Sequence, residues 1–244
     1  MPHRPEQNPV SKSRLQPAGV DELFNSIRQT LGTLSCWGCS GFCCSDQTLV
    51  KLDAWTACGK TDTQKETLDH IHSELGVCQR CTLSHQRRHI LFGQGSPSAD
   101  LVFVGQMPAK EEDQSGQYYH GPAGQLLLKM IGAMKLTPEQ VYICNMVKCS
   151  GAAKSIDIQT CLPFLKRQLQ AIAPKVICTL GEGPSQILLD QSEAIASLRG
   201  RFFNYAHGKI MPTLDLAFLM DHPEEKRKVW EDLKKIMAYL GIAL

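Results

Sequence analysis

Apolar residues recur along the chain in two patterns, first at helical spacing and then in short continuous runs. The helical spacing predicts one amphipathic helix over 20–34. It predicts a second helix over 62–75, with Leu68, Ile71 and Leu75 on one face. From there onward the pattern changes to a regular alternation of strands and helices.

Four near-continuous apolar runs predict parallel strands that are covered on both faces. They lie at 100–105, 141–147, 175–181 and 209–214. Predicted helices lie between and after them, at 122–134, 157–173, 182–190 and 223–240. This order predicts a three-layer α/β/α sandwich around a four-stranded, mainly parallel sheet, with an N-terminal helical and cysteine-rich extension. Ligands in such folds bind beyond the carboxyl ends of the strands.

Length and composition suit one α/β domain with a smaller appendage. We expect a disordered tail over 1–19, a helix and cysteine-rich extension over 20–60, and the α/β domain over 61–244. The formal net charge of +2 does not by itself indicate nucleic-acid binding. The sequence contains no membrane-spanning apolar stretch and no secretory signal, so we expect a cytoplasmic protein.

Eleven cysteines are many for a chain of 244 residues, and metal ligation explains them better than disulfides in a reducing compartment. Cys78 and Cys81 form a CxxC just before the first strand, Cys149 follows the second strand, and Cys161 lies in the next helix. Four such cysteines could hold a zinc ion or an iron–sulfur cluster. Alternatively, Cys149 and Cys161 are small buried apolar residues.

A second group of cysteines lies in the predicted extension. It comprises Cys36, Cys39, Cys43 and Cys44, with Cys58 nearby. The group could bind a second metal or take part in redox chemistry. A small packing knot with incidental thiols is the simpler interpretation, because the spacing alone does not define a metal site.

Nine stretches in one order between residue 77 and residue 240 carry a resemblance to a known family. They are VCQRCTL, LFGQGSPSADLVFVG, EDQSGQYYHGPAGQLL, VYICNMVKC, CLPFL, PKVICTLG, LRG, MPT and KRKVWEDLKKIM. This segment resembles the iron–sulfur (type 4) uracil-DNA glycosylases of the uracil-DNA glycosylase superfamily. The resemblance implies a 4Fe–4S cluster on Cys78, Cys81, Cys149 and Cys161. It also implies base-excision repair, by hydrolysis of the N-glycosidic bond of a flipped-out uracil or other deaminated base.

The same resemblance implies roles for residues near the strand ends. Tyr119 stands where the family has a base-stacking Phe. Asn145 matches the base-reading Asn, whose amide can donate to O4 and accept from N3–H of uracil. Glu112 matches a carboxylate of the first active-site loop, and Gly105 opens that loop in a substrate-binding position.

The first and second active-site motifs also depart from the family. Gln106 replaces a Glu and Ala109 replaces a Gly in the first loop. Asp215 stands where the second motif carries a His that donates to the uracil oxygen. An ionised carboxylate there would repel the anion that develops on the leaving base. His222-Pro223 lies seven residues too late to replace that His. Gln106 and Asp215 nevertheless join Glu112 as candidate catalytic residues.

Three functions stay open on the sequence. The first is a diverged uracil-DNA glycosylase, which retention of the pocket residues favours. The second is a catalytically impaired iron–sulfur protein that binds nucleic acid, which Asp215 and Gln106 favour. The third is a redox- or metal-responsive iron–sulfur protein, which only the N-terminal cysteines favour. The expected partner is DNA that contains uracil or a related lesion, bound by a monomer without membrane association.

Overall fold

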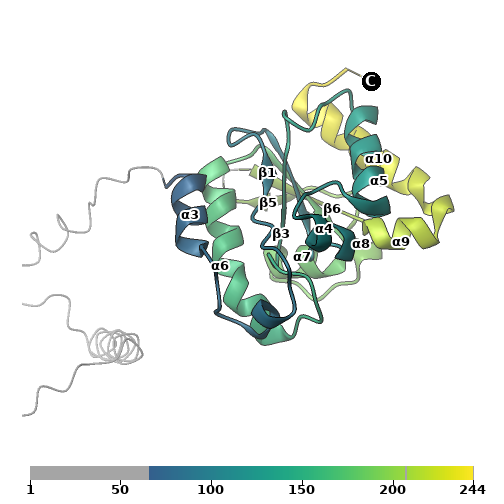
Figure 1. The fold of residues 1–244 in the computed structure, drawn as a ribbon. Coiled ribbons are helices and arrows are strands. Elements are labelled where there is room, and N and C mark those ends of the chain that lie inside the picture. Colours follow the sequence, from purple (N-terminus) through teal and green to yellow (C-terminus); the bar gives the residue numbers. More distant parts are fainter. Residues whose placement is uncertain (1–65, 207, 244) are drawn as a thin grey trace, which may run out of the picture. The chain divides into compact units, whose positions relative to one another are not determined.

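The computed structural model describes residues 66–206 and 208–243 (Figure 1). The tail predicted over 1–19 and the extension predicted over 20–60, with its cysteine group, lie outside the described residues. Among the helices that the structure describes, none combines the length and apolar character needed to cross a membrane.

A six-stranded sheet forms the middle layer, in the order β1-β3-β2-β4-β6-β5. The strands are β1 Gln94–Gly95, β2 Leu101–Gly105, β3 Tyr142–Asn145, β4 Val176–Leu180, β5 Phe203–Tyr205 and β6 Gly208–Thr213. The four predicted strands are β2, β3, β4 and β6, and they pair in parallel. The prediction of four strands is corrected to six, because β1 and β5 pair antiparallel at the two edges. Strands of two or three residues are too short to leave a recognisable pattern in the sequence.

Helices cover the sheet and connect its strands. They are α3 Leu68–Leu75, α4 Lys110–Ser115, α5 Gly121–Ala133, α6 Ser155–Ile172, α7 Glu182–Leu189, α8 Ile195–Leu198, α9 Leu216–Asp221 and α10 Lys226–Leu240, with short 3-10 helices at Thr82–His85 and Pro223–Glu225. The predicted helices of the α/β domain correspond to α3, α5, α6, α7 and α10. The sequence does not predict α4, α8 and α9, whose four to six residues span too few turns to show a helical period.

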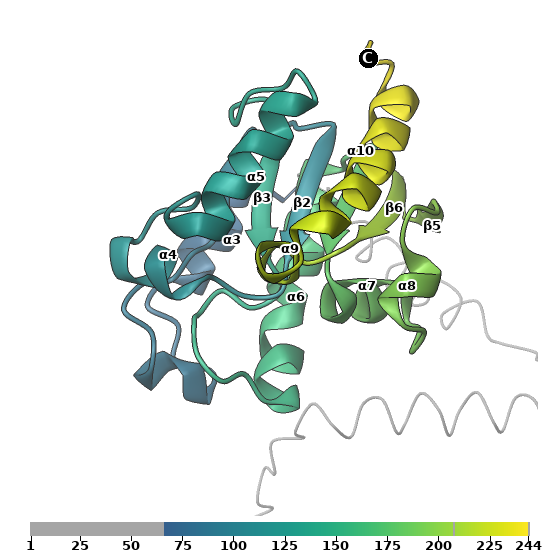
Figure 2. The same cartoon turned by 90° about the vertical axis from the view of Figure 1, so that its right-hand side faces the viewer.

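Different helices cover the two faces of the sheet, which makes the three predicted layers. Figure 2 looks onto the face covered by α5, α9 and α10. On this face Phe103 of β2 packs in one core with Leu127 of α5 and Leu233 of α10. On the opposite face Val104 of β2 packs in a second core with Leu165 of α6. Successive residues of a strand thus enter opposite cores, so both must be apolar.

A buried carboxylate ties α10 to the sheet. Asp232 Oδ2 accepts a hydrogen bond from Thr213 Oγ1 at 2.7 Å. Both Asp232 oxygens also accept from Arg199 Nη2, at 2.9 and 2.8 Å. Thr213 ends β6 only two residues before Asp215, so this carboxylate also fixes where the chain leaves the strand.

Replacement of Asp232 by Ala should lower the free energy of unfolding by about 3 kcal/mol, because the half-buried Arg199 guanidinium loses its carboxylate partner. Urea denaturation followed by circular dichroism measures the change. Glu231→Ala is the matched control, since Glu231 forms an exposed ion pair with Lys234 at 2.8 Å and its loss should leave stability nearly unchanged. Equal, small effects of both substitutions would show that Asp232 does not anchor α10.

Candidate functional site

A pocket of about 390 Å³ lies at the carboxyl ends of the four parallel strands. It is lined by Gly105, Gln106, Met107, Pro108, Ala109, Glu112, Ala123, Gly124, Leu127, Ile143, Asn145, Leu180, Asp215, Leu216 and Ala217. The chain runs from β2 to β3 on one side and returns to β4 on the other side of β2. Such a reversal of strand order is where α/β folds bind ligands. The pocket therefore brings together all the predicted catalytic and substrate-binding positions except Tyr119.

Asn145 is the last residue of β3, and its side chain leans across the end of β2. A Cβ placed on Gly105 would lie 2.3 Å from Asn145 Oδ1, so only glycine leaves room for this amide. Two backbone hydrogen bonds continue the pairing past the strands: Met146 N donates to Gly105 O at 2.8 Å, and Val147 N donates to Gln106 O at 3.0 Å. The wall that carries Asn145 is thus held rigidly against the first loop.

Glu112 lines the pocket, but its two oxygens also hold the backbone around it. Oε2 accepts from the backbone N–H of Ala109 at 3.1 Å, where α4 begins. Oε1 accepts from the backbone N–H of Tyr119 at 3.1 Å. Burial raises the pKa of the Glu112 carboxyl above its ordinary value, and these two N–H groups act in the opposite direction. Glu112 therefore orders the first loop as well as facing the pocket.

Tyr119 does not line the pocket, although the sequence predicts it as a stacking platform. Its ring is buried in the core beneath α5, and burial raises the pKa of its phenol to about 12. Its backbone adopts a left-handed conformation with φ of 64°, which is uncommon outside glycine. Gln125 Nε2 donates to Tyr119 O at 3.0 Å, and a Cβ on Gly124 would lie 2.4 Å from the Tyr119 carbonyl carbon. The backbone of Tyr119 is thus held in place next to the pocket, and the stacking role of its ring stays a prediction.

Asp215 follows β6 and immediately precedes α9, so its carboxyl faces the free N–H groups of the helix. Burial raises the pKa of this carboxyl above its ordinary value. The backbone N–H groups of Leu216, Ala217 and Phe218 lower the pKa but do not outweigh burial. Asp215 is therefore protonated at a higher pH than an Asp in water, and it stays in the pocket as the sequence predicts.

The four cysteines predicted as ligands come from three segments. Cys81, Cys149 and Cys161 belong to one apolar cluster, and Cys78 packs against the adjacent one. The pKa of the Cys149 thiol is raised to about 11, chiefly by burial and in part by Cys161 and Cys81. Burial also raises the pKa of Cys161, with smaller contributions from Cys81 and Cys78. Within residues 66–206 and 208–243 every cysteine is a free thiol, and no three His, Cys, Asp or Glu side chains converge as a single metal ion would require.

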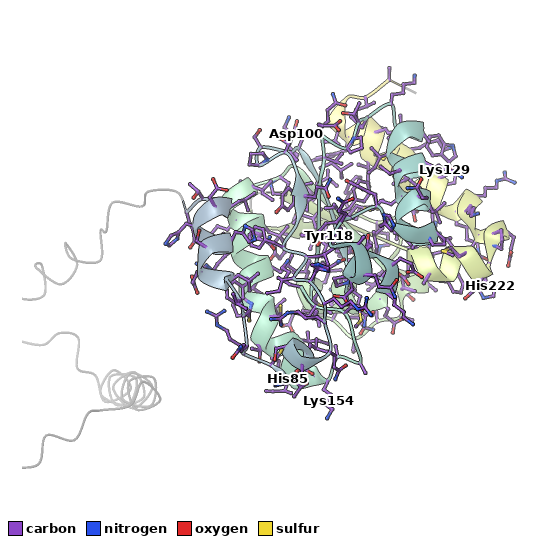
Figure 3. All side chains as sticks on the ribbon, viewed as in Figure 1. His85, Asp100, Tyr118, Lys129, Lys154 and His222 are labelled. Atoms are coloured by element: carbon purple, nitrogen blue, oxygen red, sulfur yellow. The ribbon has the colours of Figure 1, made fainter. Side chains whose placement is uncertain are left out.

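Asp157 joins the CxxC segment to α6, which carries Cys161. Its Oδ1 accepts from the backbone N–H and the hydroxyl of Thr82, at 3.1 and 2.9 Å. Its Oδ2 accepts from the backbone N–H of Lys154 at 2.9 Å and so caps the helix. These hydrogen bonds, that from Lys154 most of all, hold the pKa of Asp157 below its ordinary value. Figure 3 labels His85 and Lys154 from these two segments at the lower edge of the domain.

Two cationic side chains that the sequence analysis does not single out lie against these segments. Arg87 donates to Cys149 Sγ at 3.3 Å and to the backbone oxygen of Cys78 at 2.5 Å. Lys148 directly precedes Cys149 and is completely buried, and burial lowers the pKa of its ammonium. The signal for Lys148 is its place in the apolar run VYICNMVKC, because a lysine is almost never fully buried without a partner. Nothing in the local sequence marks Arg87.

Comparison with known proteins places this fold and pocket in a family. The family model for the uracil DNA glycosylase superfamily matches residues 92–234. The type-4 uracil-DNA glycosylase of Saccharolobus solfataricus is 32% identical over 189 residues, covering 72% of this chain and 88% of the relative. Those of Archaeoglobus fulgidus and Thermotoga maritima are each 30% identical, covering 72% and 73% of this chain and 94% and 97% of the relatives. The chain therefore belongs to the uracil-DNA glycosylase superfamily and, within it, to the type-4 uracil-DNA glycosylases.

Proposed function

We propose that this protein hydrolyses the N-glycosidic bond of uracil in DNA and so acts in base-excision repair. The observation that carries the proposal is the pocket at the strand ends, which gathers Asn145, Asp215, Glu112 and Gln106 in one cavity. Its relatives bear the name type-4 uracil-DNA glycosylase. The proposed partner is DNA that contains uracil, bound by a monomer.

Recognition of the base falls to the wall formed by the end of β3. A flipped nucleotide presents its base edge to the pocket. The Asn145 amide can donate to a uracil carbonyl oxygen and accept from the ring N–H, a pair of contacts that cytosine does not match. Gly105 leaves the space in which the amide sits. Backbone hydrogen bonds between the first loop and the residues after β3 keep the amide in place before the base binds.

Breakage of the bond leaves a cation on the sugar and negative charge on an oxygen of the base. A protonated Asp215 can donate to that oxygen, and its raised pKa enlarges the protonated fraction. The Glu112 carboxylate can stabilise the sugar cation, although two backbone N–H groups already occupy part of its acceptor capacity. Gln106 can orient the attacking water but cannot take its proton, because an amide is not a base at neutral pH.

Cys78, Cys81, Cys149 and Cys161 are the proposed ligands of a 4Fe–4S cluster. The donor set contains thiols alone, which is the chemistry that such clusters require. Three of these thiols belong to one apolar cluster, and Cys78 packs against the adjacent one. When bound, the cluster would supply a covalent cross-link between the CxxC segment, the end of β3 and α6. Hydrolysis itself would use the side chains of the pocket.

A nucleic-acid-binding protein without catalysis is the second candidate. The observation that favours it is Asp215, because a carboxyl that ionises in the pocket repels the leaving anion. The two candidates share base recognition and differ in cleavage, so the experiments below separate them.

Replacement of Asn145 by Ala should weaken the binding of uracil, or of DNA carrying the cleaved product, by about 1–3 kcal/mol, because a buried base edge loses its partner. Isothermal titration calorimetry measures the difference. Asn204→Ala, an exposed residue of β5, is the control and should bind like the unaltered protein. Unchanged binding by Asn145→Ala would place base recognition elsewhere.

Uracil excision should become faster as the pH falls from neutral. The pKa of Asp215 is raised, so the fraction of Asp215 in its protonated, donating form increases as the solution becomes more acidic. Asp215→Asn should flatten this pH dependence. Asp215→His should raise the neutral-pH rate on the order of a hundredfold, the usual effect of one oxyanion donor. Single-turnover cleavage of uracil-containing DNA gives these rates. Fast cleavage at neutral pH that Asp215→His slows would contradict the role of Asp215, and inert variants that still bind DNA would favour the second candidate.

Protein purified without oxygen should be brown, absorb at about 400 nm and contain about four iron atoms per chain, as a cluster on four thiolates requires. Iron analysis and visible spectroscopy test this. Cys161→Ala should lose the iron, whereas Cys178→Ala, at a buried cysteine of β4 outside the set, should retain it. Stoichiometric zinc with no iron would rule out the cluster.

A further inference from the structure

Within the part of the chain that the structure describes, Lys148 is a buried cation without a carboxylate partner. No part of its side chain is exposed to solvent, which is rare for lysine. Within the described residues it forms no ion pair with Asp or Glu, and the ionisable groups that act on it are the thiols of Cys144, Cys149 and Cys161. A buried charge is stable only when an opposite charge and hydrogen bonds accompany it. The question is which group supplies the negative charge.

Its hydrogen bonds hold Lys148 between several segments of the fold. Nζ donates to the backbone oxygen of Asn145 at 2.7 Å and to Gln168 Oε1 at 2.5 Å. Gln168 is itself buried in α6, and its Nε2 donates to Phe92 O at 2.9 Å. The backbone oxygen of Lys148 accepts from Leu91 N at 2.9 Å. The polar groups named in this network all have hydrogen-bond partners, but none of these groups is an anion.

The proposed cluster would supply an anionic group close to Lys148. Lys148 is adjacent to Cys149 in the chain, and its ammonium donates to Gln168 of α6, the helix that carries Cys161. One residue thus contacts two segments that carry proposed ligands and, through its side chain, the residue proposed to read the base. Four thiolates around an iron–sulfur core carry net negative charge, which would lie beside the ammonium.

We propose that Lys148 is a positioning residue that couples the proposed cluster to the pocket. It is the buried counter-charge of the cluster, and its hydrogen bond to the backbone oxygen of Asn145 fixes the residue whose side-chain amide lines the pocket. This inference rests on the proposed function for its account of Asn145. Removal of the cluster takes away the charge that keeps the ammonium buried. The hydrogen bond from Lys148 to the backbone oxygen of Asn145 then weakens. The side-chain amide of Asn145 is in turn held less firmly in the pocket.

The first experiment compares Lys148→Met with Gln168→Met. Both substitutions place methionine in the same buried network, so a purely structural role predicts similar effects. Coupling predicts that Lys148→Met loses iron to a chelator about tenfold faster, because the groups around the ligands lose their positive charge, and that it lowers the reduction potential of the cluster. Gln168→Met retains the cation and should keep the release rate and the potential of the unaltered protein. Equal changes in the two variants would overturn the proposal.

The second experiment uses the unaltered protein and needs no variant to fold. Chelation of the iron should speed amide hydrogen exchange in residues 145–148 more than in β4, which carries no proposed ligand. It should also weaken uracil binding. Equal acceleration in both segments would mean that the cluster supports the whole fold without coupling, and unchanged exchange in 145–148 would also overturn the proposal.

These readouts remain separate from the proposed function. Iron release and reduction potential report on Lys148 even in a protein that does not cleave DNA, so inactivity alone contradicts only the glycosylase. Iron-free protein that excises uracil would instead support the glycosylase and overturn the role of Lys148.

Discussion

Parallel pairing of β2 with β3, and its continuation past both strand ends, is the constraint on which the site depends. It sets Gly105 opposite Asn145 and then joins Met146 and Val147 to the first loop through backbone hydrogen bonds. The chain that leaves β3 is therefore held against the first loop before it reaches Cys149. Any slip in this register would move the Asn145 amide and the cysteine segment together, because only three residues lie between Asn145 and Cys149.

The pocket obtains its electrostatic character from the backbone more than from charged side chains. Among the residues that line it none is basic, and its two carboxyl groups, Glu112 and Asp215, both have pKa values raised by burial. Helix α9 presents its first N–H groups beside Asp215, and α5 begins at the opposite wall with Ala123 and Gly124. Oriented N–H groups of this kind favour negative charge without requiring a cationic side chain. A carboxyl at position 215 therefore lies near backbone donors.

The sequence contains enough information for the layers of the fold and for the membership of the pocket. Continuous apolar runs identify β2, β3, β4 and β6, and the rule on strand ends then places Asn145 and Asp215 in one cavity. It does not contain enough for features that depend on tertiary contacts. The edge strands are too short to show a period. The buried Tyr119 has a left-handed backbone conformation, and its backbone is held by hydrogen bonds with Glu112 and Gln125, which are not visible in the sequence. Partners far apart in the chain, such as Arg87 and Cys149, leave no local pattern.

The attachment of α10 through Asp232 has a consequence for the order in which the site is assembled during synthesis. Asp232 holds Thr213 from a position 19 residues later in the chain. All four cysteines proposed as ligands, by contrast, lie before residue 162. A ribosome therefore releases the complete set of thiols, together with β2 and β3, while the wall that contains Asp215 still lacks its anchor. The segment that would receive iron is synthesised before the part of the chain that completes the catalytic pocket.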